Sequence, residues 1–340
     1  MRIVVDGMGS DNAPYPEVEG AVAASLVDDI EVILVGNEVL LRPALDQFPK
    51  RGAISIAHAS KRVAMDDLPM TAVRQKKDNS LLVGLRLVKD GDAEGFVSAG
   101  NTGAVMLCAR VVLGPIFGVA RSAICQVLPT TRKPVVVLDL GANVNCTVDQ
   151  LCEFAEMGQV FSRLTMGIAQ PRIGLLSIGE EDGKGTEVTK KVNRNLTMAE
   201  HVNFVGNVEP KAVFEGKADV VICDGFTGNI LLKTSEAVAS LIGTLTARHI
   251  RSTFISTFGG LLSSGALKRL KKTTDPNEQQ GAPLLGVNGI VIIQHGSTSA
   301  LGVENAILGA RTEIELGLNE HIRKGIEELR SAIPAGENGK

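Results

Sequence analysis

Aromatic residues are scarce in this chain of 340 residues. They make up 3% of the sequence, with a single tyrosine and no tryptophan. Proteins that hold single-stranded nucleic acids stack the bases on aromatic side chains. Strong positive charge is also missing, because the formal net charge is −3. We therefore expect no nucleic-acid partner, since the overall charge does not favour a polyanion.

Cysteine is scarce too. The five cysteines are scattered, odd in number and nowhere spaced as C-x-x-C. This usage is typical of reduced core thiols in a cytosolic protein and argues against a zinc site. No H-E-x-x-H or other paired-ligand spacing is present either, so we expect no metal.

Long hydrophobic runs are missing. The longest, such as Val135–Leu138 and Ile290–Ile293, are strand-sized, whereas a spanning helix needs roughly 20 residues. The segment Met1–Asp6 also lacks the layout of a signal peptide. These absences predict a cytoplasmic protein without a transmembrane span. With 44% hydrophobic residues, the chain can bury a large core without disulfides or a structural metal.

Short β-branched runs alternate with helical stretches. Several predicted strands are apolar at consecutive positions, which indicates burial on both faces. The alternation predicts an α/β fold with three layers, in which helices flank a mostly parallel sheet. We expect one domain over residues 1–333 and a frayed tail at 334–340. The sequence leaves open whether this domain has one lobe or two. The predicted strands are Arg2–Asp6, Glu31–Val35, Ile54–Ala57, Gly95–Ser98, Ala123–Leu128, Val135–Asp139, Arg172–Ile178, Val202–Val205, Ala218–Cys223 and Gly289–Ile293.

Loops rich in glycine and small polar residues follow many of these strands. Ligands of open α/β sheets bind at the carboxyl ends of strands, and free N–H groups at helix starts favour anions. The strongest candidate follows Gly95–Ser98, where glycines let the backbone approach a ligand closely. Alternatively, this loop is a tight turn whose Asn or Thr caps the next helix. The anion-binding candidates are Ser98, Gly100, Asn101, Thr102 and Gly103.

Other loop residues have two interpretations each. Lys184 either contacts an anionic group or is a solvated lysine balanced by neighbouring acidic residues. Asn229 either donates into a site or begins a helix. His295 follows a predicted strand and is either a site residue or a structural histidine. The residues Asp6, Asn143 and Gly185 lie in further strand-end loops expected to face the substrate.

The sequence lacks the motifs of several enzyme classes. Gly7-x-Gly9 has Asn12 where a dinucleotide fingerprint needs its third glycine, and no Walker motif is present. No cofactor is therefore expected. No G-x-S-x-G elbow appears, and no cysteine stands in a nucleophile setting. We therefore expect direct transfer between two bound substrates.

A helical hairpin is predicted to protrude at about 234–272. Its apolar stripe includes Phe254, Phe258, Leu261 and Leu262 and is interrupted by Gly259-Gly260. Six basic residues and no acidic residue lie between positions 248 and 272. One interpretation is a hairpin packed in the core or at a dimer seam. We favour the other, in which an apolar tip with basic flanks touches an anionic membrane surface.

In this order, the loops resemble those of the PlsX-type phosphate acyltransferases of bacterial phospholipid synthesis. One departure lies in the first loop, where the family usually has a glycine and a histidine in place of Ser10 and Asn12. The resemblance covers nearly the whole chain through Val5-Asp6, Ser98–Ala104, Leu138–Asn143, Gly179–Gly185, Asn203–Glu209, Asp219–Lys233, Gly281–Gly286 and His295–Ser297.

The resemblance implies transfer of a fatty acyl group from acyl carrier protein to inorganic phosphate, giving acyl phosphate. It also implies a homodimer, a fold similar to isocitrate dehydrogenase and phosphotransacetylase, and peripheral membrane attachment. The product would pass to a membrane glycerol-3-phosphate acyltransferase. In this chemistry Asn101 and Thr102 would hold phosphate, Lys184 and Asn229 would stabilise the oxyanion, and His295 would assist the leaving thiolate or orient phosphate.

Acyl carrier protein is strongly acidic, so a basic docking surface is expected. Candidates are Arg74, Lys76 and Lys77 or the cluster Lys268–Lys272, which could instead bind anionic lipid. Two alternative functions remain open at this stage. One is a phosphotransacetylase-like enzyme that uses acyl-CoA, and the other is a non-catalytic membrane scaffold that recruits acyl carrier protein.

Overall fold

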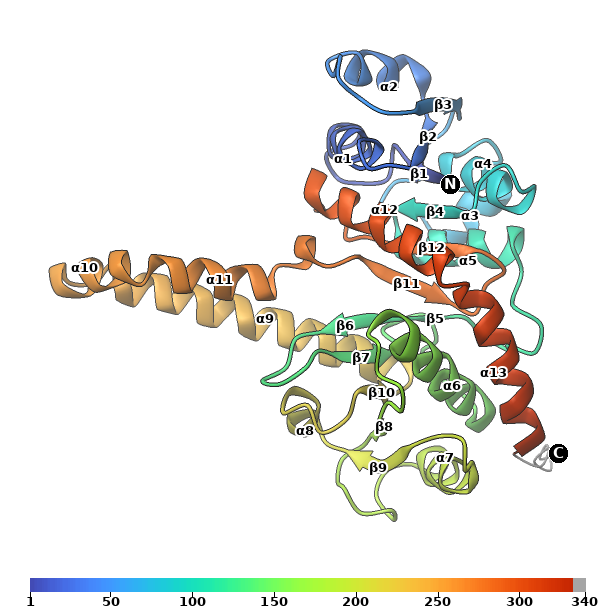
Figure 1. Ribbon diagram of the computed structural model, residues 1–340, viewed down its shortest axis with the longest axis vertical. Coiled ribbons are helices and arrows are strands. Elements are labelled where there is room, and N and C mark those ends of the chain that lie inside the picture. Colours follow the sequence, from blue (N-terminus) through green and yellow to red (C-terminus); the bar gives the residue numbers. More distant parts are fainter. Residues whose placement is uncertain (333–340) are drawn as a thin grey trace.

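The computed structural model describes residues 1–332, so the tail predicted at 334–340 lies outside the described residues. The strands form two sheets, whereas the sequence predicted one, and each sheet with its helices makes up one lobe (Figure 1). The first sheet has the order β3(Ile54–His58)-β2(Glu31–Gly36)-β1(Arg2–Asp6)-β4(Gly95–Ser98)-β12(Ile290–Ile293)-β11(Ala282–Leu285)-β5(Ala123–Ile124). The second has the order β6(Gln126–Leu128)-β7(Val135–Leu138)-β10(Val220–Ile222)-β8(Ile173–Leu176)-β9(Phe204–Val208).

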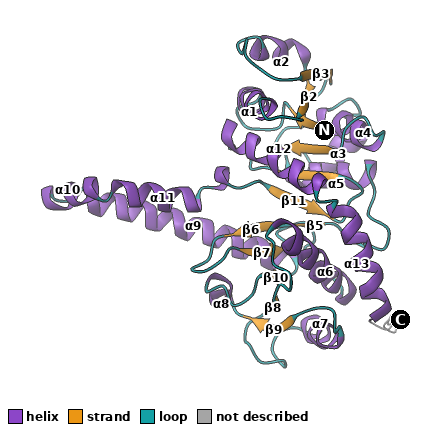
Figure 2. Ribbon diagram, in the orientation of Figure 1, coloured by secondary structure: helices purple, strands orange, loops and turns teal. Residues whose placement is uncertain are grey.

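Both sheets are mostly parallel and flanked by helices, as predicted (Figure 2). Only the pairs formed by β11 and by β6 are antiparallel in the described residues. The first lobe contains α1(Tyr15–Ser25), α2(Glu38–Leu45), α3(Pro69–Arg74), α4(Ser80–Lys89), α5(Thr102–Val112) and α12(Ala300–Glu315). The second contains α6(Val148–Thr165), α7(Glu187–Met198), α8(Pro210–Phe214) and α13(Leu318–Ala332).

The core explains why these residues form strands. β4 and β12 are buried along their whole length, as expected for strands covered on both faces. One apolar cluster runs through both lobes and includes Val97 of β4 and Leu138 of β7. The two lobes therefore share a hydrophobic core.

Each predicted strand overlaps an observed one, but two details differ. The run predicted at 123–128 is divided into β5 and β6, because the chain passes from the first sheet to the second at Cys125. The strand β11 was missed, since Pro283 interrupts the strand pattern. Proline lacks the N–H that a ladder needs.

Three helices form an arm that projects from the body (Figure 1). These are α9(Gly225–Ile250), α10(Phe254–Leu262) and α11(Ser264–Thr274), which contain the hairpin predicted at 234–272. The two glycines that interrupt the apolar stripe, Gly259 and Gly260, both lie inside α10. The turn between α9 and α10 lies at residues 251–253, where Thr253 caps α10. A Cβ at Gly260 would lie 2.3 Å from Ile250 Cγ2, so this glycine lets α10 pack against α9.

The helix α9 is long and apolar enough, by length and composition, to cross a membrane. None of the residues in its most apolar stretch is buried. The sequence predicted no such segment, since Lys233, Glu236 and Arg248 interrupt its apolar residues. In the fold, α9 begins beside β7 and continues into the arm, so its apolar side chains are exposed on a projecting helix.

Candidate active site

A chain of hydrogen bonds joins the ends of β1 and β4. The Ser98 hydroxyl donates to Asp6 Oδ2 over 2.7 Å and accepts from the Gly100 N–H at 3.0 Å. Asp6 also accepts from the Met8 N–H. Burial raises the pKa of the Asp6 carboxyl, and these hydrogen bonds oppose that rise. Since the Ser98 hydroxyl is buried and already paired, its predicted role in phosphate binding would be one of positioning the loop.

The loops after β1, β4 and β12 lie against one another. Parallel pairing places Ile293 beside Ser98 and Val5 beside Val97, so the three carboxyl ends share one edge. A Cβ at Gly9 would lie 2.7 Å from the Gly100 nitrogen, so the two backbones touch here. Close backbone approach of this kind requires glycine.

The helix α5 begins at this edge. Its N-cap is Asn101, whose Oδ1 accepts from the Ala104 N–H, so the capping interpretation is confirmed for this residue. The N–H groups of Thr102 and Gly103 make no hydrogen bond within residues 1–332. Free N–H groups at the positive end of a helix dipole favour an anion.

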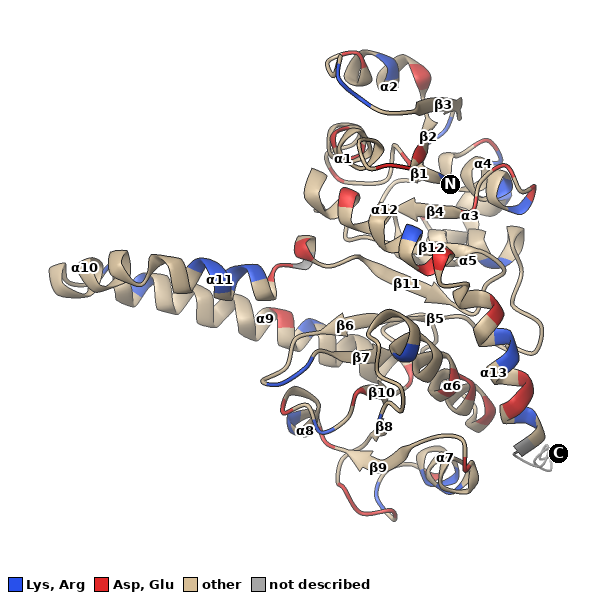
Figure 3. Cartoon of the chain, in the orientation of Figure 1, with Lys and Arg blue, Asp and Glu red and all other residues tan. Residues whose placement is uncertain are grey.

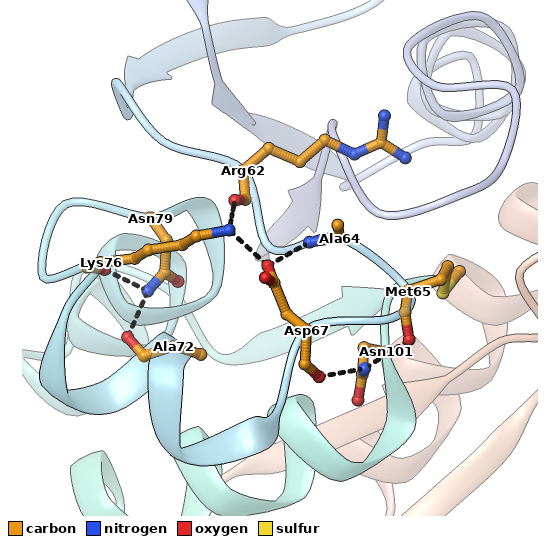
Figure 4. A network of polar contacts seen from close by, with 8 residues as sticks. All are labelled: Arg62, Ala64, Met65, Asp67, Ala72, Lys76, Asn79 and Asn101. Atoms are coloured by element: carbon orange, nitrogen blue, oxygen red, sulfur yellow. Dashed lines mark hydrogen bonds and ion pairs between the residues drawn. The ribbon is translucent and has the colours of Figure 1, made fainter.

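The amide of Asn101 also anchors the segment before α4 (Figure 4). Its Nδ2 donates to the carbonyl oxygens of Met65 and Asp67, at 2.7 and 3.0 Å. The Asp67 carboxylate accepts from Lys76 Nζ and from the Ala64 N–H. With all its polar groups paired, Asn101 could hold phosphate through its side chain only by giving up one of these bonds.

His295 lies at the same edge, just after β12. Its Nδ1 accepts from the Ser297 N–H and lies 2.8 Å from the Ser297 hydroxyl. A backbone N–H can only donate, so the neutral ring carries its hydrogen on Nε2. The side chain is exposed, which leaves this N–H free to meet a ligand.

Asp139 organises the corresponding loop of the second lobe, and the sequence analysis did not select it. It is fully buried and follows β7. Its carboxylate accepts from the N–H groups of Ile124, Ala142 and Asn143 and from the Asn143 side-chain amide. Burial raises its pKa, and the hydrogen bonds oppose the rise. Asp139 therefore fixes the predicted substrate residue Asn143.

The start of α9 packs on this loop. Its N-cap is Asp224, which accepts from the Thr227 N–H at 2.8 Å. The interpretation of Asn229 as a helix-start residue is therefore wrong, because Asn229 lies inside α9. A Cβ at Gly228 would lie 1.9 Å from the backbone carbonyl oxygen of Asp139, and one at Gly141 would lie 3.7 Å from Asn229 Cβ. Asn229 is exposed beside the loop after β7.

Lys184 lies in the loop between β8 and α7. One interpretation is that neighbouring acidic residues balance the charge of Lys184. Glu180 does not do so, because it pairs with Lys217. Within the described chain, Lys184 Nζ forms no ion pair or hydrogen bond, and the residue is exposed. The adjacent Gly185 has φ +93°, a conformation that favours glycine. A Cβ there would lie 3.1 Å from the buried Ser177 hydroxyl, which has no hydrogen-bond partner among the described residues.

The structure thus gathers the predicted residues into two groups. Asp6, the loop from Ser98 to Gly103, and His295 lie at the edge of the first sheet. Asn143, Asn229, Lys184 and Gly185 follow β7, β10 and β8, which are neighbours in the second. No hydrogen bond joins the two groups within residues 1–332. Together they offer an anion site at α5 and cationic and amide donors in the other lobe.

A buried carboxyl, Glu17, supports the first group and was missed in the sequence. Its Oε1 accepts from the Ser10 N–H at 2.7 Å, while Oε2 and the Ser10 hydroxyl are buried and have no hydrogen-bond partner in the part of the chain that the structure describes. Burial raises the pKa of Glu17 to about 7, against the lowering effect of the hydrogen bond from the Ser10 N–H. Ser10 lies on the loop that contacts Gly100, so the hydrogen bond to Glu17 helps to hold this loop in place.

Four of the five cysteines are buried, and Cys146 is half-buried. All five are free. Burial raises the pKa of Cys146 to about 12 and that of Cys223 well above its usual value, so thiolates are scarce at neutral pH. Among the described residues, no group of three or more His, Cys, Asp or Glu side chains could hold a metal ion.

Residues 1–321 match the family described as "Fatty acid synthesis protein". The chain is 46% identical to the phosphate acyltransferase of Trichlorobacter lovleyi over 334 residues, covering 98% of this chain and 96% of the relative. It is 44% identical to the phosphate acyltransferase of Geobacter sulfurreducens, covering 96% and 94%.

Solved structures show the same architecture. A phosphotransacetylase from Streptococcus pyogenes superposes with a TM-score of 0.62 at 19% identity, covering 93% of this chain and 94% of that one. The EutD phosphotransacetylase from Staphylococcus aureus gives 0.59 at 17% identity, covering 92% and 94%. At these identities the likeness concerns the fold, and the predicted similarity to the phosphotransacetylase fold is confirmed.

Proposed function

The chain belongs to the fatty acid synthesis protein family of phosphate acyltransferases, and on that premise we propose that it transfers a fatty acyl group from acyl carrier protein to inorganic phosphate. That it is an acyltransferase follows from the family. We propose three further points: that acyl carrier protein is the donor, which residues take part in the reaction, and where in the cell the reaction occurs.

One observation supports phosphate binding at α5 above all others. The N–H groups of Thr102 and Gly103, which make no hydrogen bond within residues 1–332, lie at the carboxyl edge of β1, β4 and β12. Backbone donors at a helix N-terminus hold a phosphate oxyanion without the entropy cost of ordering long side chains. The hydrogen bonds from Ser98 to Asp6 and from Gly100 to Ser98 fix the backbone before phosphate arrives. His295 Nε2–H supplies a further donor at this edge.

The reaction is a direct displacement. A phosphate oxygen attacks the thioester carbonyl carbon, the carbon–oxygen bond forms, and a tetrahedral oxyanion results. The carbon–sulfur bond then breaks, and the carrier leaves as a thiolate that accepts a hydrogen bond from His295 Nε2–H and takes a proton from water. A thiol with a pKa of about 8.5 needs little acid assistance. Fixing both substrates side by side contributes much of the acceleration, so a covalent intermediate is unnecessary.

The second lobe supplies the donors for the oxyanion. Lys184 Nζ is unpaired within the described residues, and Asn229 is exposed on the first turns of α9. A preorganised donor aimed at the developing negative charge lowers the barrier more than one that also binds the ground state. The acyl donor would thus bridge the two lobes, with phosphate at the first and the carbonyl oxygen at the second.

We also propose a cytoplasmic homodimer that attaches peripherally to anionic membranes. The tip residues Phe254, Phe258, Leu261 and Leu262 are 89, 57, 68 and 74% exposed. Exposed apolar side chains beside basic ones favour an anionic lipid surface. Along α9, Val238, Leu241 and Ile242 form a second exposed apolar stripe, which a second copy would cover. Attachment would place acyl phosphate near a membrane glycerol-3-phosphate acyltransferase and so serve phospholipid synthesis.

An acyl-CoA donor is the alternative that the fold favours, since the structural neighbours are phosphotransacetylases. The test is to offer long-chain acyl-carrier protein and acyl-CoA at equal concentration with phosphate and to trap acyl phosphate as hydroxamate. We expect faster product formation from the carrier. Faster reaction with acyl-CoA would establish the alternative. Absence of product from either donor would favour the non-catalytic scaffold.

A further inference from the structure

The segment between β3 and α4 covers the start of α5. It is attached there through the Asn101 amide, which binds the carbonyls of Met65 and Asp67 (Figure 4). A Cβ at Gly103 would lie 2.9 Å from Pro69 Cγ, and one at Gly296 would lie 2.4 Å from Met65 Cε. The segment therefore touches both the helix start and the His295 loop. Anything bound on its outer face would lie beside the candidate phosphate site.

This segment is basic in a chain that is acidic overall. Between residues 60 and 78, five cationic side chains stand against three carboxylates, whereas the whole chain has a net charge of −3. The cations are Lys61, Arg62, Arg74, Lys76 and Lys77, and the carboxylates are Asp66, Asp67 and Asp78.

The structure sorts these cations into two kinds. Lys76 Nζ donates to the Asp67 carboxylate and to the Arg62 carbonyl, so this lysine holds the segment together (Figure 4). The Arg62 guanidinium donates to the Ser10 carbonyl. By contrast, Lys61, Arg74 and Lys77 are exposed, and their side chains form no hydrogen bond or ion pair within residues 1–332.

Exposed apolar side chains accompany the free cations. Leu68 and Met70 are 73 and 46% exposed. Met70 and Arg74 are four residues apart on α3 and so share one face of the helix. Residues 61 and 79 form a parallel bridge, which holds Lys61 next to the end of this segment. We call Lys61, Leu68, Met70, Arg74 and Lys77 the docking patch.

We propose that the docking patch binds the acidic carrier protein that delivers the acyl group. The inference rests on the proposed function, because it takes the donor to be a carrier protein. Charge complementarity supports this occupant, since three cations that form no ion pair within residues 1–332 surround apolar side chains and suit an acidic protein surface. Its place beside the start of α5 would bring the thioester to phosphate. The cluster Lys268–Lys272 lies instead on the arm, on the part of α11 that leads from the apolar tip back to the body, where it suits lipid (Figure 3).

The test is charge reversal in the variant Arg74→Glu/Lys77→Glu. We expect its KM for acyl-carrier protein to rise at least tenfold, with a smaller change in kcat and a weaker dependence of KM on salt. Charged residues at the rim of an interface mainly change the rate at which the two partners associate, and salt screens this effect. The neutral variant Arg74→Ala/Lys77→Ala should raise KM about threefold and keeps the test valid if charge reversal disturbs folding. The matched control is Arg86→Glu/Lys89→Glu on α4, which has the same change in charge at exposed positions.

The outcomes separate this inference from the proposed function. If the unmodified enzyme forms no acyl phosphate from acyl-carrier protein, the proposed function fails whatever the variants do. If the unmodified enzyme forms acyl phosphate and the Arg74 and Lys77 variants have the same KM as the control, the docking patch does not bind the carrier. Loss of binding to phosphatidylglycerol vesicles with an unchanged KM for the carrier would assign the patch to lipid and overturn the inference.

Discussion

The Ser98 hydroxyl donates a 2.7 Å hydrogen bond to the Asp6 carboxylate, although 92 residues separate them in the chain. The bond is buried and joins the ends of two neighbouring parallel strands. Because Ser98 also accepts from the Gly100 N–H, it couples the loop after β1 to the start of α5. The candidate phosphate site therefore depends on a contact between two loops rather than on either loop alone.

Removing this hydroxyl should loosen the site. In Ser98→Ala, the Asp6 carboxylate loses a donor and the Gly100 N–H loses its acceptor in a buried place. We expect the free energy of unfolding to fall by about 1–3 kcal/mol, and the KM for phosphate to rise severalfold. Urea denaturation and phosphate titration measure the two effects. The variant Ser331→Ala, at an exposed serine of α13, is the control. A KM for phosphate equal to that of the control would contradict the positioning role.

The stability of the protein should depend on pH through Glu17. Its pKa is about 7 when folded and 4.5 for the unperturbed group. Between these values the unfolded chain loses the proton that the folded chain keeps, so stability falls as pH rises. The protonated Glu17 contributes up to about 3 kcal/mol to the free energy of unfolding at low pH, and this contribution is lost by the time pH exceeds 7.

The variant Glu17→Gln isolates this effect, because its amide oxygen can still accept from Ser10 and has no charge to bury. Relative to the unmodified protein, its free energy of unfolding should rise between pH 5 and pH 8. Urea titrations at both values measure the difference. The control is Glu19→Gln at an exposed position of α1. Equal differences for the two variants would show that Glu17 ionises normally.

Lys184 should matter for turnover more than for binding. If its ammonium stabilises the oxyanion, Lys184→Ala lowers kcat about 100- to 1000-fold and changes the KM for the acyl donor little. Initial rates of acyl phosphate formation measure both. Lys190→Ala, at a lysine of α7 that pairs with Glu187, is the control in the same lobe. Turnover near that of the unmodified enzyme would remove Lys184 from the mechanism.

The arm tip should carry membrane affinity. Full burial of one phenylalanine contributes about 2 kcal/mol, and partial insertion about half. The variant Phe254→Ser/Phe258→Ser should therefore bind anionic vesicles at least tenfold more weakly in a sedimentation assay. Phe117→Ser is the matched control, because Phe117 is 78% exposed on the body. If the tip variant sediments like the control, the tip is not the attachment site.

Much of the fold could be predicted because local patterns are strong where strands are buried. The apolar run Gly95–Ser98 is β4 with the same bounds. The division into two sheets could not be predicted, since it depends on which distant strands pair. β4 lies between β1 and β12, which are far from it and from each other in the sequence. Burial determines a strand, whereas pairing determines its sheet.

The candidate site was predicted in part. Glycine loops at strand ends placed Gly100, Thr102 and Gly103 at an edge that the structure forms from three strands. The side chains of Ser98 and Asn101 proved to be occupied by Asp6, Met65 and Asp67. No spacing in the sequence indicates such partners, because they come from loops that only the folded sheet brings together.

By itself the sequence determined the α/β class, the glycine-rich loops and the positions of its charges, because composition and periodicity are local properties of the chain. The tertiary structure decided which of those charges are available. Lys76 and Lys77 are neighbours in the sequence, yet Lys76 is paired with Asp67 while Lys77 is exposed without a partner in the described residues. The direction in which each side chain leaves the backbone, and what lies there, is set only when the chain has folded.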